Sequence, residues 1–220
     1  RAAWVAGGVV TLGAIAVVVS VLAFGGGKPA ASSEASVAAA LRAANCSYRT
    51  VKPLPPRKDP GGAMGGYHED VPTLATPTKG LWSTFPPSAG AHFDTWAVWG
   101  FYRQAVNPRE VVHNEEHGGV VIWWGPGVPD ATVDELEAFY QQEMTGVFGT
   151  PIAGLGNKIA LTAWTDPKKA YYRNGNYGIG HIAVCTGFDQ RAFAAFRDAF
   201  RGKGPEGTPL ALDAPGMGPQ

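Results

Sequence analysis

The stretch VVHNEEHGGVVIWW, residues 111–124, joins a polar cluster of two histidines and two glutamates to two glycines and an apolar run. The run from Val120 to Trp124 has the continuous apolar character of a buried strand. Gly118 and Gly119 precede it, and glycine can end a helix because it adopts positive φ without strain. The stretch therefore predicts one helical turn at residues 113–117 that leads directly into an interior strand.

The spacing of His113 and His117 decides whether they can share a metal ion. In a strand the two residues would lie about 13 Å apart, whereas at positions i and i+4 of a helix their Cβ atoms come within about 6 Å. On such a turn Glu116 lies about 300° around the axis from His113, close to its face, and Glu115 lies about 200° away. A metal site therefore requires the helical turn, with Glu116 as ligand or base.

The alternative is a capped turn whose histidines hydrogen-bond only to backbone carbonyls and to neighbouring carboxylates. Two histidines and two glutamates beside a buried strand would be costly to desolvate unless they were paired or coordinated. This cost favours coordination of a metal ion over the capped turn.

Two histidines leave a metal site incomplete, and three others occur in the chain. His92, in the segment PPSAGAHF just before the first predicted strand, is the first candidate for a further ligand. His181 is the second candidate, although a lone histidine in an apolar strand is more often a hydrogen-bonded core residue. His68, among glycines and acids, is expected to be exposed. The predicted site holds one transition-metal ion, copper or zinc, through His92, His113, His117 and Glu116.

The remaining pattern predicts an α+β domain in which two helices pack on a small, mostly antiparallel sheet. An Asn-Gly signal in YYRNGNYG, residues 171–178, indicates a hairpin-like turn. The predicted strands are Trp96–Tyr102, Val120–Trp124, Lys158–Trp164 and Ile179–Cys185. The predicted helices are Ser36–Cys46, Ala131–Met144 with Asp130 as N-cap, and a last one that carries Phe193, Phe196 and Phe200 and ends at Gly202.

An uncharged segment from Trp4 to Phe24 precedes this domain. As a helix it would measure roughly 31 Å, against about 30 Å for the hydrocarbon core of a bilayer. The alternative, a secretory signal, has a shorter apolar stretch of about 7 to 15 residues. We therefore expect a single-pass anchor whose partner is the lipid bilayer through residues 4–24.

The sequence thus divides into four parts: a transmembrane anchor (1–27), a linker with a short helix and an irregular Pro/Gly-rich arm (28–78), a soluble α+β domain (79–206) and a flexible tail (207–220). Lysine plus arginine and aspartate plus glutamate number 18 each, so no general attraction to nucleic acid is expected.

Cys46 and Cys185 are the two cysteines of the chain. In an oxidising compartment they could form a disulfide, which by closing a long loop would stabilise the fold by about 4 to 5 kcal/mol. The alternative is two buried free thiols. The flanking charges Arg1 and Lys28 nearly cancel under the positive-inside rule, so the extracytoplasmic placement of the domain depends mainly on these cysteines.

Four segments, PPSAGAHF, WGFY, VVHNEEHGGVVIWW and FRGKGPEG, together resemble the bacterial family called domain of unknown function 3105. The resemblance covers Lys79 to Glu206, and the family tends to have threonine or serine and proline where this chain has Ala89 and Ala91. It implies a membrane-anchored or secreted protein whose histidine segments form the site, and it implies no activity. The family's motif residues correspond to His92, His113, Glu116, His117 and Gly118.

Three functional hypotheses follow from the sequence. The first is a membrane-anchored, extracytoplasmic metal-binding protein, an accessory subunit of a membrane redox complex. The second is a metal-dependent hydrolase with Glu116 as general base. The segment does fit the His-x-x-Glu-His pattern of some zinc peptidases, but the glycines and strand that follow at once disfavour a peptidase. The third is a metal-free structural subunit of a membrane complex, held by its anchor and proline-rich arm.

Overall fold

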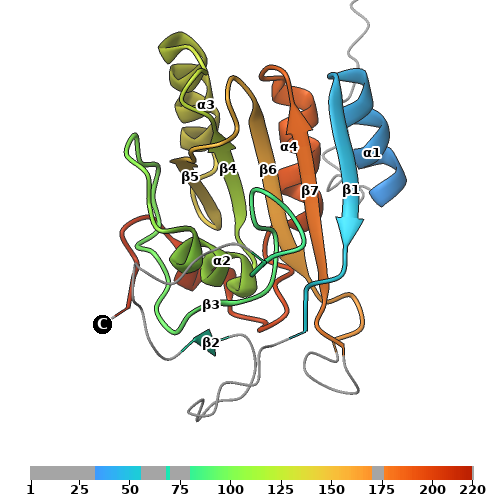
Figure 1. Ribbon diagram of the computed structural model, residues 1–220, viewed down its shortest axis with the longest axis vertical. Coiled ribbons are helices and arrows are strands. Elements are labelled where there is room, and N and C mark those ends of the chain that lie inside the picture. Colours follow the sequence, from blue (N-terminus) through green and yellow to red (C-terminus); the bar gives the residue numbers. More distant parts are fainter. Residues whose placement is uncertain (1–32, 56–67, 70–79, 170–175, 220) are drawn as a thin grey trace, which may run out of the picture. The chain divides into compact units, whose positions relative to one another are not determined.

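The computed structural model describes residues 33–55, 68–69, 80–169 and 176–219. Its main element is a five-stranded sheet with the order β1-β7-β6-β4-β5 (Figure 1). All neighbouring strands are antiparallel except β4 and β5, which are parallel. The strands are β1 (Cys46–Val51), β4 (Val120–Trp124), β5 (Val147–Pro151), β6 (Ile159–Thr165) and β7 (Ile179–Cys185). The predicted α+β class with a mostly antiparallel sheet is confirmed.

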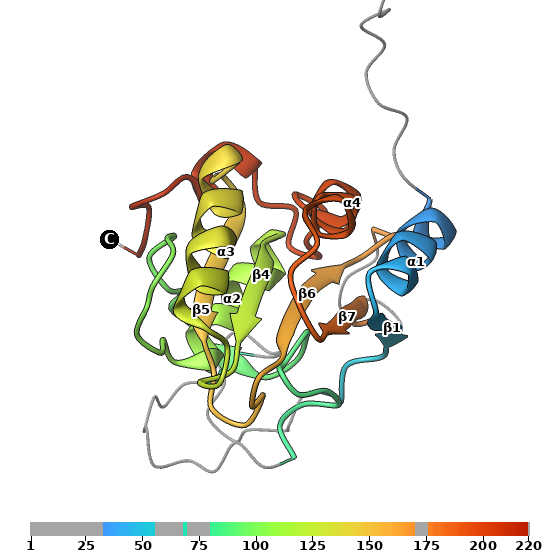
Figure 2. The same cartoon turned by 90° about the horizontal axis from the view of Figure 1, so that it is seen from above.

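Helices cover both faces of this sheet, as the view from above shows (Figure 2). One face carries three helices, and the other face carries the remaining helix, α2, together with the segment before it. Whereas the sequence predicts two helices on the sheet, a short helix before the domain and a helical turn at residues 113–117, four helices pack on the sheet in the part of the chain that is described. They are α1 (Glu34–Ala43), α2 (Pro108–His117), α3 (Asp130–Gln142) and α4 (Gln190–Phe200), followed by the 3-10 helix η1 (Leu210–Asp213).

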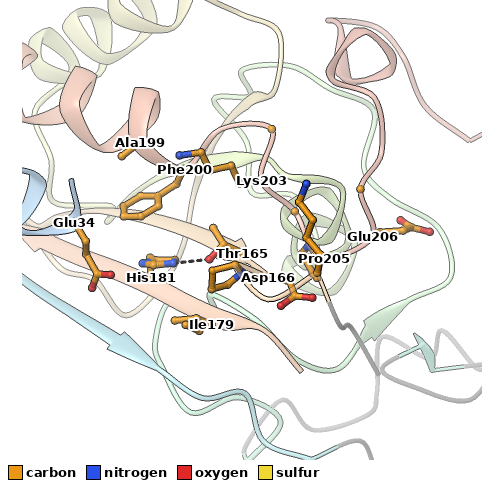
Figure 3. A pocket seen from close by; sticks show the side chains of 15 residues that line it. Glu34, Thr165, Asp166, Ile179, His181, Ala199, Phe200, Lys203, Pro205 and Glu206 are labelled. Atoms are coloured by element: carbon orange, nitrogen blue, oxygen red, sulfur yellow. Dashed lines mark hydrogen bonds between the residues drawn. The ribbon is translucent and has the colours of Figure 1, made fainter. Parts of the chain in front are cut away.

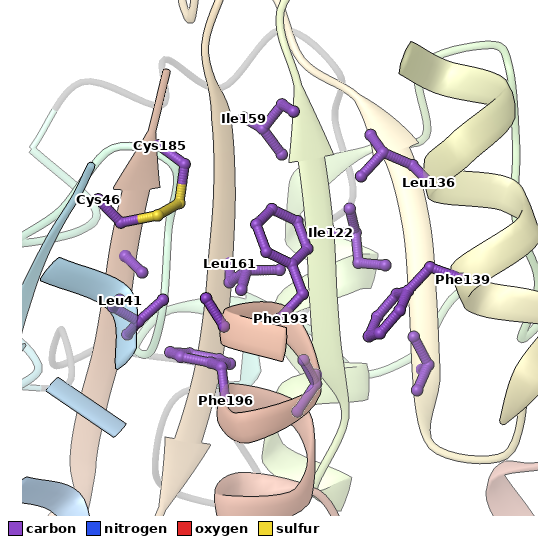
Figure 4. Packing of buried hydrophobic residues seen from close by; sticks show 14 of the residues in the cluster. Leu41, Cys46, Ile122, Leu136, Phe139, Ile159, Leu161, Cys185, Phe193 and Phe196 are labelled. Atoms are coloured by element: carbon purple, nitrogen blue, oxygen red, sulfur yellow. A yellow bond between two sulfur atoms is a disulfide. The ribbon is translucent and has the colours of Figure 1, made fainter. Parts of the chain in front are cut away.

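The face covered by α1, α3 and α4 forms the larger apolar core (Figure 4). Alternate residues of the strands point to this face, as the side-chain period of two requires. Ile122 and Leu161 meet Leu136 of α3 and Phe193 of α4, and all four are buried. Burial of each such side chain stabilises the fold by about 1.5 to 3 kcal/mol.

The predicted disulfide between Cys46 and Cys185 is present and is drawn in Figure 4. The two cysteines lie directly opposite each other in the antiparallel register of β1 and β7. Both are buried in the larger core. The bond therefore fixes the first strand of the sheet to the last strand, across 139 residues of sequence.

Some element boundaries differ from the prediction. The first helix begins at Glu34 and not at Ser36, because the Ser33 side chain accepts the N–H of Ser36 at 3.2 Å. It ends before Cys46, which starts β1, and the turn places Asn45 at φ 57°. Asp130 is the first residue of α3 and not its cap.

The predicted strand Trp96–Tyr102 is wrong. Only Phe101 makes a β-bridge, to Gly149, while Trp99 exchanges backbone hydrogen bonds with Met217 and Gly216. The aromatic character of the segment reflects burial, because Trp99 packs in a second core cluster beneath α2. Residues 207–217, where the sequence predicts a flexible tail, thus include η1 and the partners of Trp99.

Within the described ranges, no helix has both the length and the apolar composition needed to cross a bilayer. The predicted span, residues 4–24, lies outside these ranges. So do parts of the Pro/Gly-rich arm and of the predicted hairpin at residues 171–178.

Candidate metal centre

The helix that carries the two motif histidines is α2. The Asn107 side chain accepts the N–H of Arg109 at 3.1 Å, and Pro108 occupies the first turn, where its missing N–H costs nothing. The helix ends at Gly118, whose φ of 116° is left-handed. The helical prediction for residues 113–117 is confirmed, and the helix is longer than predicted because it starts at Pro108.

Asn114 fixes α2 against the segment that precedes it. Its side chain accepts the N–H of Ala97 at 3.0 Å and donates to the carbonyl of the same residue at 2.9 Å. This pair of bonds places the neighbouring Trp96 against two imidazoles, with ring centroids 5.4 Å from His113 and 4.9 Å from His117.

The face of α2 directed away from the sheet contributes to a group of four side chains that we call the inner cluster: His68, His92, His113 and Glu116. One ligand atom from each of the four lies within 4.8 Å of the others. His68 and His92 stand opposite each other in a short parallel pair, β2 (His68–Glu69) and β3 (His92–Phe93). Oε2 of Glu116 lies 2.9 Å from Nε2 of His92 and 3.3 Å from Nε2 of His68.

The hydrogen bonds of the inner cluster occupy one ring nitrogen of His92 and one of His113, and the other nitrogen of each ring remains for a metal ion. Nδ1 of His92 donates to the carbonyl of Gly90, and Nδ1 of His113 donates to the carbonyl of Phe93, both at 2.7 Å. A carbonyl only accepts, so in the neutral rings the Nε2 atoms carry no hydrogen. Nδ1 of His68 lies 3.1 Å from the Asp94 carboxylate. Metal-ligating histidines show the same arrangement, with the second nitrogen bonded to a carbonyl or carboxylate.

The contact between His92 and Glu116 joins two hydrogen-bond acceptors when the ring is neutral and the carboxylate is ionised. His92 is fully buried, and its Nε2 makes no hydrogen bond within the described part of the chain. A carboxylate also only accepts. In that protonation state the two atoms, 2.9 Å apart in a buried site, repel each other, and a cation bound between them would remove the repulsion. The inner cluster therefore has the donor set of a metal site and could hold a metal ion.

Burial keeps His113 available for coordination. It lowers the pKa of His113 to about 3, with a further contribution from the adjacent His92. The ring is therefore neutral at physiological pH. The hydrogen bond with Glu116 raises the pKa of His68.

His113 also belongs to a second group, the outer cluster, with His117 and Glu206. Nε2 of His117 lies 3.2 Å from Oε2 of Glu206, and its Nδ1 lies 3.5 Å from the buried carboxylate of Asp213. Burial alone would lower the pKa of His117, but the bonds with Asp213 and Glu206 raise it to about 9.

The structure brings together three of the four predicted ligands, His92, His113 and Glu116. The fourth, His117, lies one turn further along α2 in the outer cluster. The expectation that His68 is exposed is wrong, because the pairing of β2 with β3 places it half-buried beside His92. Glu206 was not identified from the sequence, although it stands in the segment FRGKGPEG.

His181 lies apart from both clusters, and both of its ring nitrogens have a hydrogen-bond partner. Its Nδ1 is 2.9 Å from the hydroxyl of Tyr48 and its Nε2 is 2.8 Å from the hydroxyl of Thr165. The ring stacks on Phe200 at 4.0 Å. Figure 3 shows it at the edge of a groove of about 870 Å³, formed by β6, β7, the end of α4 and residues 202–207. Of the two readings of His181, second candidate ligand or hydrogen-bonded core residue, the structure supports the core residue.

Glu115, predicted to lie about 200° around the helix from His113, is not part of the inner cluster. It accepts a hydrogen bond from the Thr162 hydroxyl, which in turn accepts from the Trp123 indole at 2.7 Å. Complete burial raises the pKa of Glu115 well above its usual range. Burial thus disfavours the charged form of Glu115, and this residue is not part of the inner cluster.

Fold and site together define an α+β domain with buried histidine–glutamate clusters that could hold a metal ion. The chain belongs to the family described as protein of unknown function (DUF3105), whose profile matches residues 78–210. This range includes His92, His113, Glu116, His117 and Glu206, but not His68. No curated protein and no solved structure matches the chain.

Proposed function

We propose that this protein binds one transition-metal ion through His68, His92, His113 and Glu116. The observation that carries the proposal is the pair of buried imidazoles, His92 and His113. Their Nδ1 atoms donate to backbone carbonyls, and the Nε2 of His92, which makes no hydrogen bond within the described residues, lies 2.9 Å from the buried carboxylate of Glu116. Binding of a metal ion by both Nε2 atoms and the carboxylate would compensate for the hydration that these groups lose on burial.

Three imidazole nitrogens and one carboxylate oxygen suit zinc or copper(II). Zinc accepts such a set in tetrahedral geometry. Copper(I) prefers thiolate and thioether sulfur, and the sulfurs of Cys46 and Cys185 are bonded to each other. We therefore propose a divalent ion, zinc or copper, as the resident metal.

The compartment we propose is extracytoplasmic. Structural disulfides persist mainly in oxidising compartments, and the Cys46–Cys185 bond supports such a location. The apolar segment 4–24 would anchor the domain to the cell membrane as a single pass. In this position the protein would act as an accessory subunit of a membrane redox complex, as a store or donor of the metal.

Elemental analysis of the full chain, purified in detergent, tests the proposal. We expect one equivalent of zinc or copper per chain, and loss of that metal in the double variant His92→Ala, His113→Ala. The matched control is His181→Gln, since His181 is also a buried histidine but belongs to neither cluster.

Equal metal content in the double variant and the wild type would contradict the proposal and leave a metal-free structural subunit. Far-ultraviolet circular dichroism confirms that the variants fold. Because alanine at two buried positions can disturb packing, Glu116→Gln supplies a second variant of nearly unchanged shape, for which we expect weakened binding.

The same proteins separate a binder from a hydrolase. Oε2 of Glu116 contacts two imidazoles, which favours a ligand over a general base. Metal-dependent ester or peptide hydrolysis that Glu116→Gln abolishes while the metal stays bound would reverse this assignment.

A further inference from the structure

The inner and outer clusters share one coordinating atom. His113 belongs to both, and its Nδ1 already donates to the Phe93 carbonyl at 2.7 Å. Only Nε2 is left, and the single lone pair of that atom binds one ion at a time. An ion on His113 can therefore have either the inner or the outer ligands, but not both complete sets.

The two clusters differ in their access to solvent. In the inner cluster the His92 side chain is 0% exposed and that of Glu116 is 2% exposed. In the outer cluster the carboxylate-bearing side chain of Glu206 is 46% exposed, while His117 beneath it is 9% exposed. The exposure of the side chains thus decreases in the order Glu206, His117, His113, His92. These residues form a series from the surface to the interior.

The backbone holds Glu206 in this outer position. The N–H of Glu206 donates to the carbonyl of Glu116 at 3.3 Å, and the N–H of Gly202 donates to the carbonyl of Gly118 at 2.8 Å. A Cβ on Gly204 would lie 2.2 Å from the Glu116 carbonyl oxygen, so only glycine permits this close approach. The loop after α4 therefore sits directly on the end of the helix that carries His113 and His117.

A second observation marks the outer cluster as more than an exposed ion pair. Asp213 is completely buried, and its carboxylate faces His117, with Oδ1 3.5 Å from Nδ1. A carboxylate behind a histidine orients the opposite nitrogen and makes it a stronger ligand, and here that nitrogen is the one facing Glu206.

We propose that the outer cluster is the position at which the metal ion first binds before it moves to the inner cluster. This proposal rests on the proposed function. A divalent ion first binds His113, His117 and Glu206. It then exchanges His117 and Glu206 for His68, His92 and Glu116 while it stays on Nε2 of His113. His113 and His117 are one helical turn apart, with ring centroids separated by 4.8 Å, so the exchange requires no movement of the backbone of α2.

Stopped-flow mixing of the metal-free full chain with buffered Cu²⁺ tests this route. Trp96 lies against both His113 and His117, so quenching of tryptophan fluorescence reports the ion. We expect a fast phase followed by a slower phase in the wild type. In Glu206→Gln, both uptake and chelator-driven release should be slower by about ten-fold, the lower end of the effects typical for residues supporting a metal site. His92→Ala should keep the fast phase and lose the slow one.

The matched control is Glu135→Gln, which removes an exposed carboxylate on α3 and should load at the wild-type rate. Uptake by Glu206→Gln at the wild-type rate would overturn the loading role. So would two ions bound per wild-type chain at saturation, or faster release in Glu206→Gln with unchanged uptake, since either result makes Glu206 a static ligand. A wild-type protein that takes up no metal would instead refute the proposed function itself.

Discussion

Buried histidines on the two faces of the sheet differ in their hydrogen-bond partners. On the face covered by α1, α3 and α4, His181 has a hydroxyl partner on each ring nitrogen and an aromatic ring stacked against it. On the face covered by α2, His92 is equally buried, but its Nε2 makes no hydrogen bond within the described residues and lies 2.9 Å from the carboxylate of Glu116. The difference shows that pairing, and not burial, distinguishes a structural histidine from a ligand.

The comparison also separates stability from function. The face covered by α1, α3 and α4 is packed with apolar side chains and contains the disulfide. The second face buries imidazoles and carboxylates, which cost free energy unless they are paired or coordinated. Packing on the apolar face therefore offsets the free-energy cost of burying polar side chains on the other face.

The largest expected effect on the apolar face comes from the disulfide. The double variant Cys46→Ala, Cys185→Ala should lose about 4 to 5 kcal/mol of unfolding free energy, because the bond closes a long loop in the unfolded chain. Urea denaturation of both proteins measures this loss. If the two faces are separable, the folded variant still binds metal, and loss of metal binding in a folded variant would break the comparison.

Phe193→Ala should have the next largest effect, about 3 to 5 kcal/mol, because it leaves a cavity between α4 and the sheet. Thermal or urea unfolding provides the measurement. The metal content per folded molecule should stay at the wild-type value, and a change of less than 1 kcal/mol would show that this face is not the stabilising one.

Metal addition should act through the other face. A ligand that binds only the folded state at a hundred times its dissociation constant stabilises by about 2.7 kcal/mol. We expect a shift of this size when zinc is added to the metal-free wild type, and none in His113→Ala, since His113 belongs to both clusters. His181→Gln serves as the control and should keep the shift.

The smallest expected effect is a difference in acid sensitivity. Burial lowers the pKa of His181 from 6.5 to about 4, so the folded protein holds this ring neutral while the unfolded chain protonates it. The stabilisation is therefore complete above pH 6.5 and is lost as the pH falls towards 4, by at most about 1.4 kcal/mol per pH unit.

Unfolding free energies at pH 7 and pH 5 measure this effect in the metal-free protein. The loss on acidification should be smaller in His181→Gln than in the wild type. An equal loss in both proteins would mean that His181 takes up its proton in the folded state as well.

Local signals in the sequence predicted the elements on which the site is built. The apolar run Val120–Trp124, the glycine at 118 and the i, i+4 histidines define α2 and β4 within one short stretch, so no distant contact was needed. The disulfide was one of two alternatives for the two cysteines, and the structure distinguishes it from a pair of free thiols. His92 was selected because it comes just before the predicted strand Trp96–Tyr102, and it lies in the inner cluster although that strand is absent.

Long-range contacts account for what the sequence did not show. His68 enters the site through a strand pair of two residues in a region without periodicity. Glu206 enters through backbone packing between Gly204 and the end of α2. The segment Trp96–Tyr102 was predicted as a strand because aromatic residues are frequent in strands. In the structure most of these aromatic residues pack in the core cluster beneath α2.

The contact between Gly204 and the end of α2 has a practical consequence for shortened versions of the protein. A fragment that stops at Phe200 would retain all five strands of the main sheet and the four α-helices. It would nevertheless lack Glu206, Asp213 and the residues that bond to Trp99. Such a fragment could pass every test of folding and still leave His117 uncovered, so expression boundaries should extend to at least Met217.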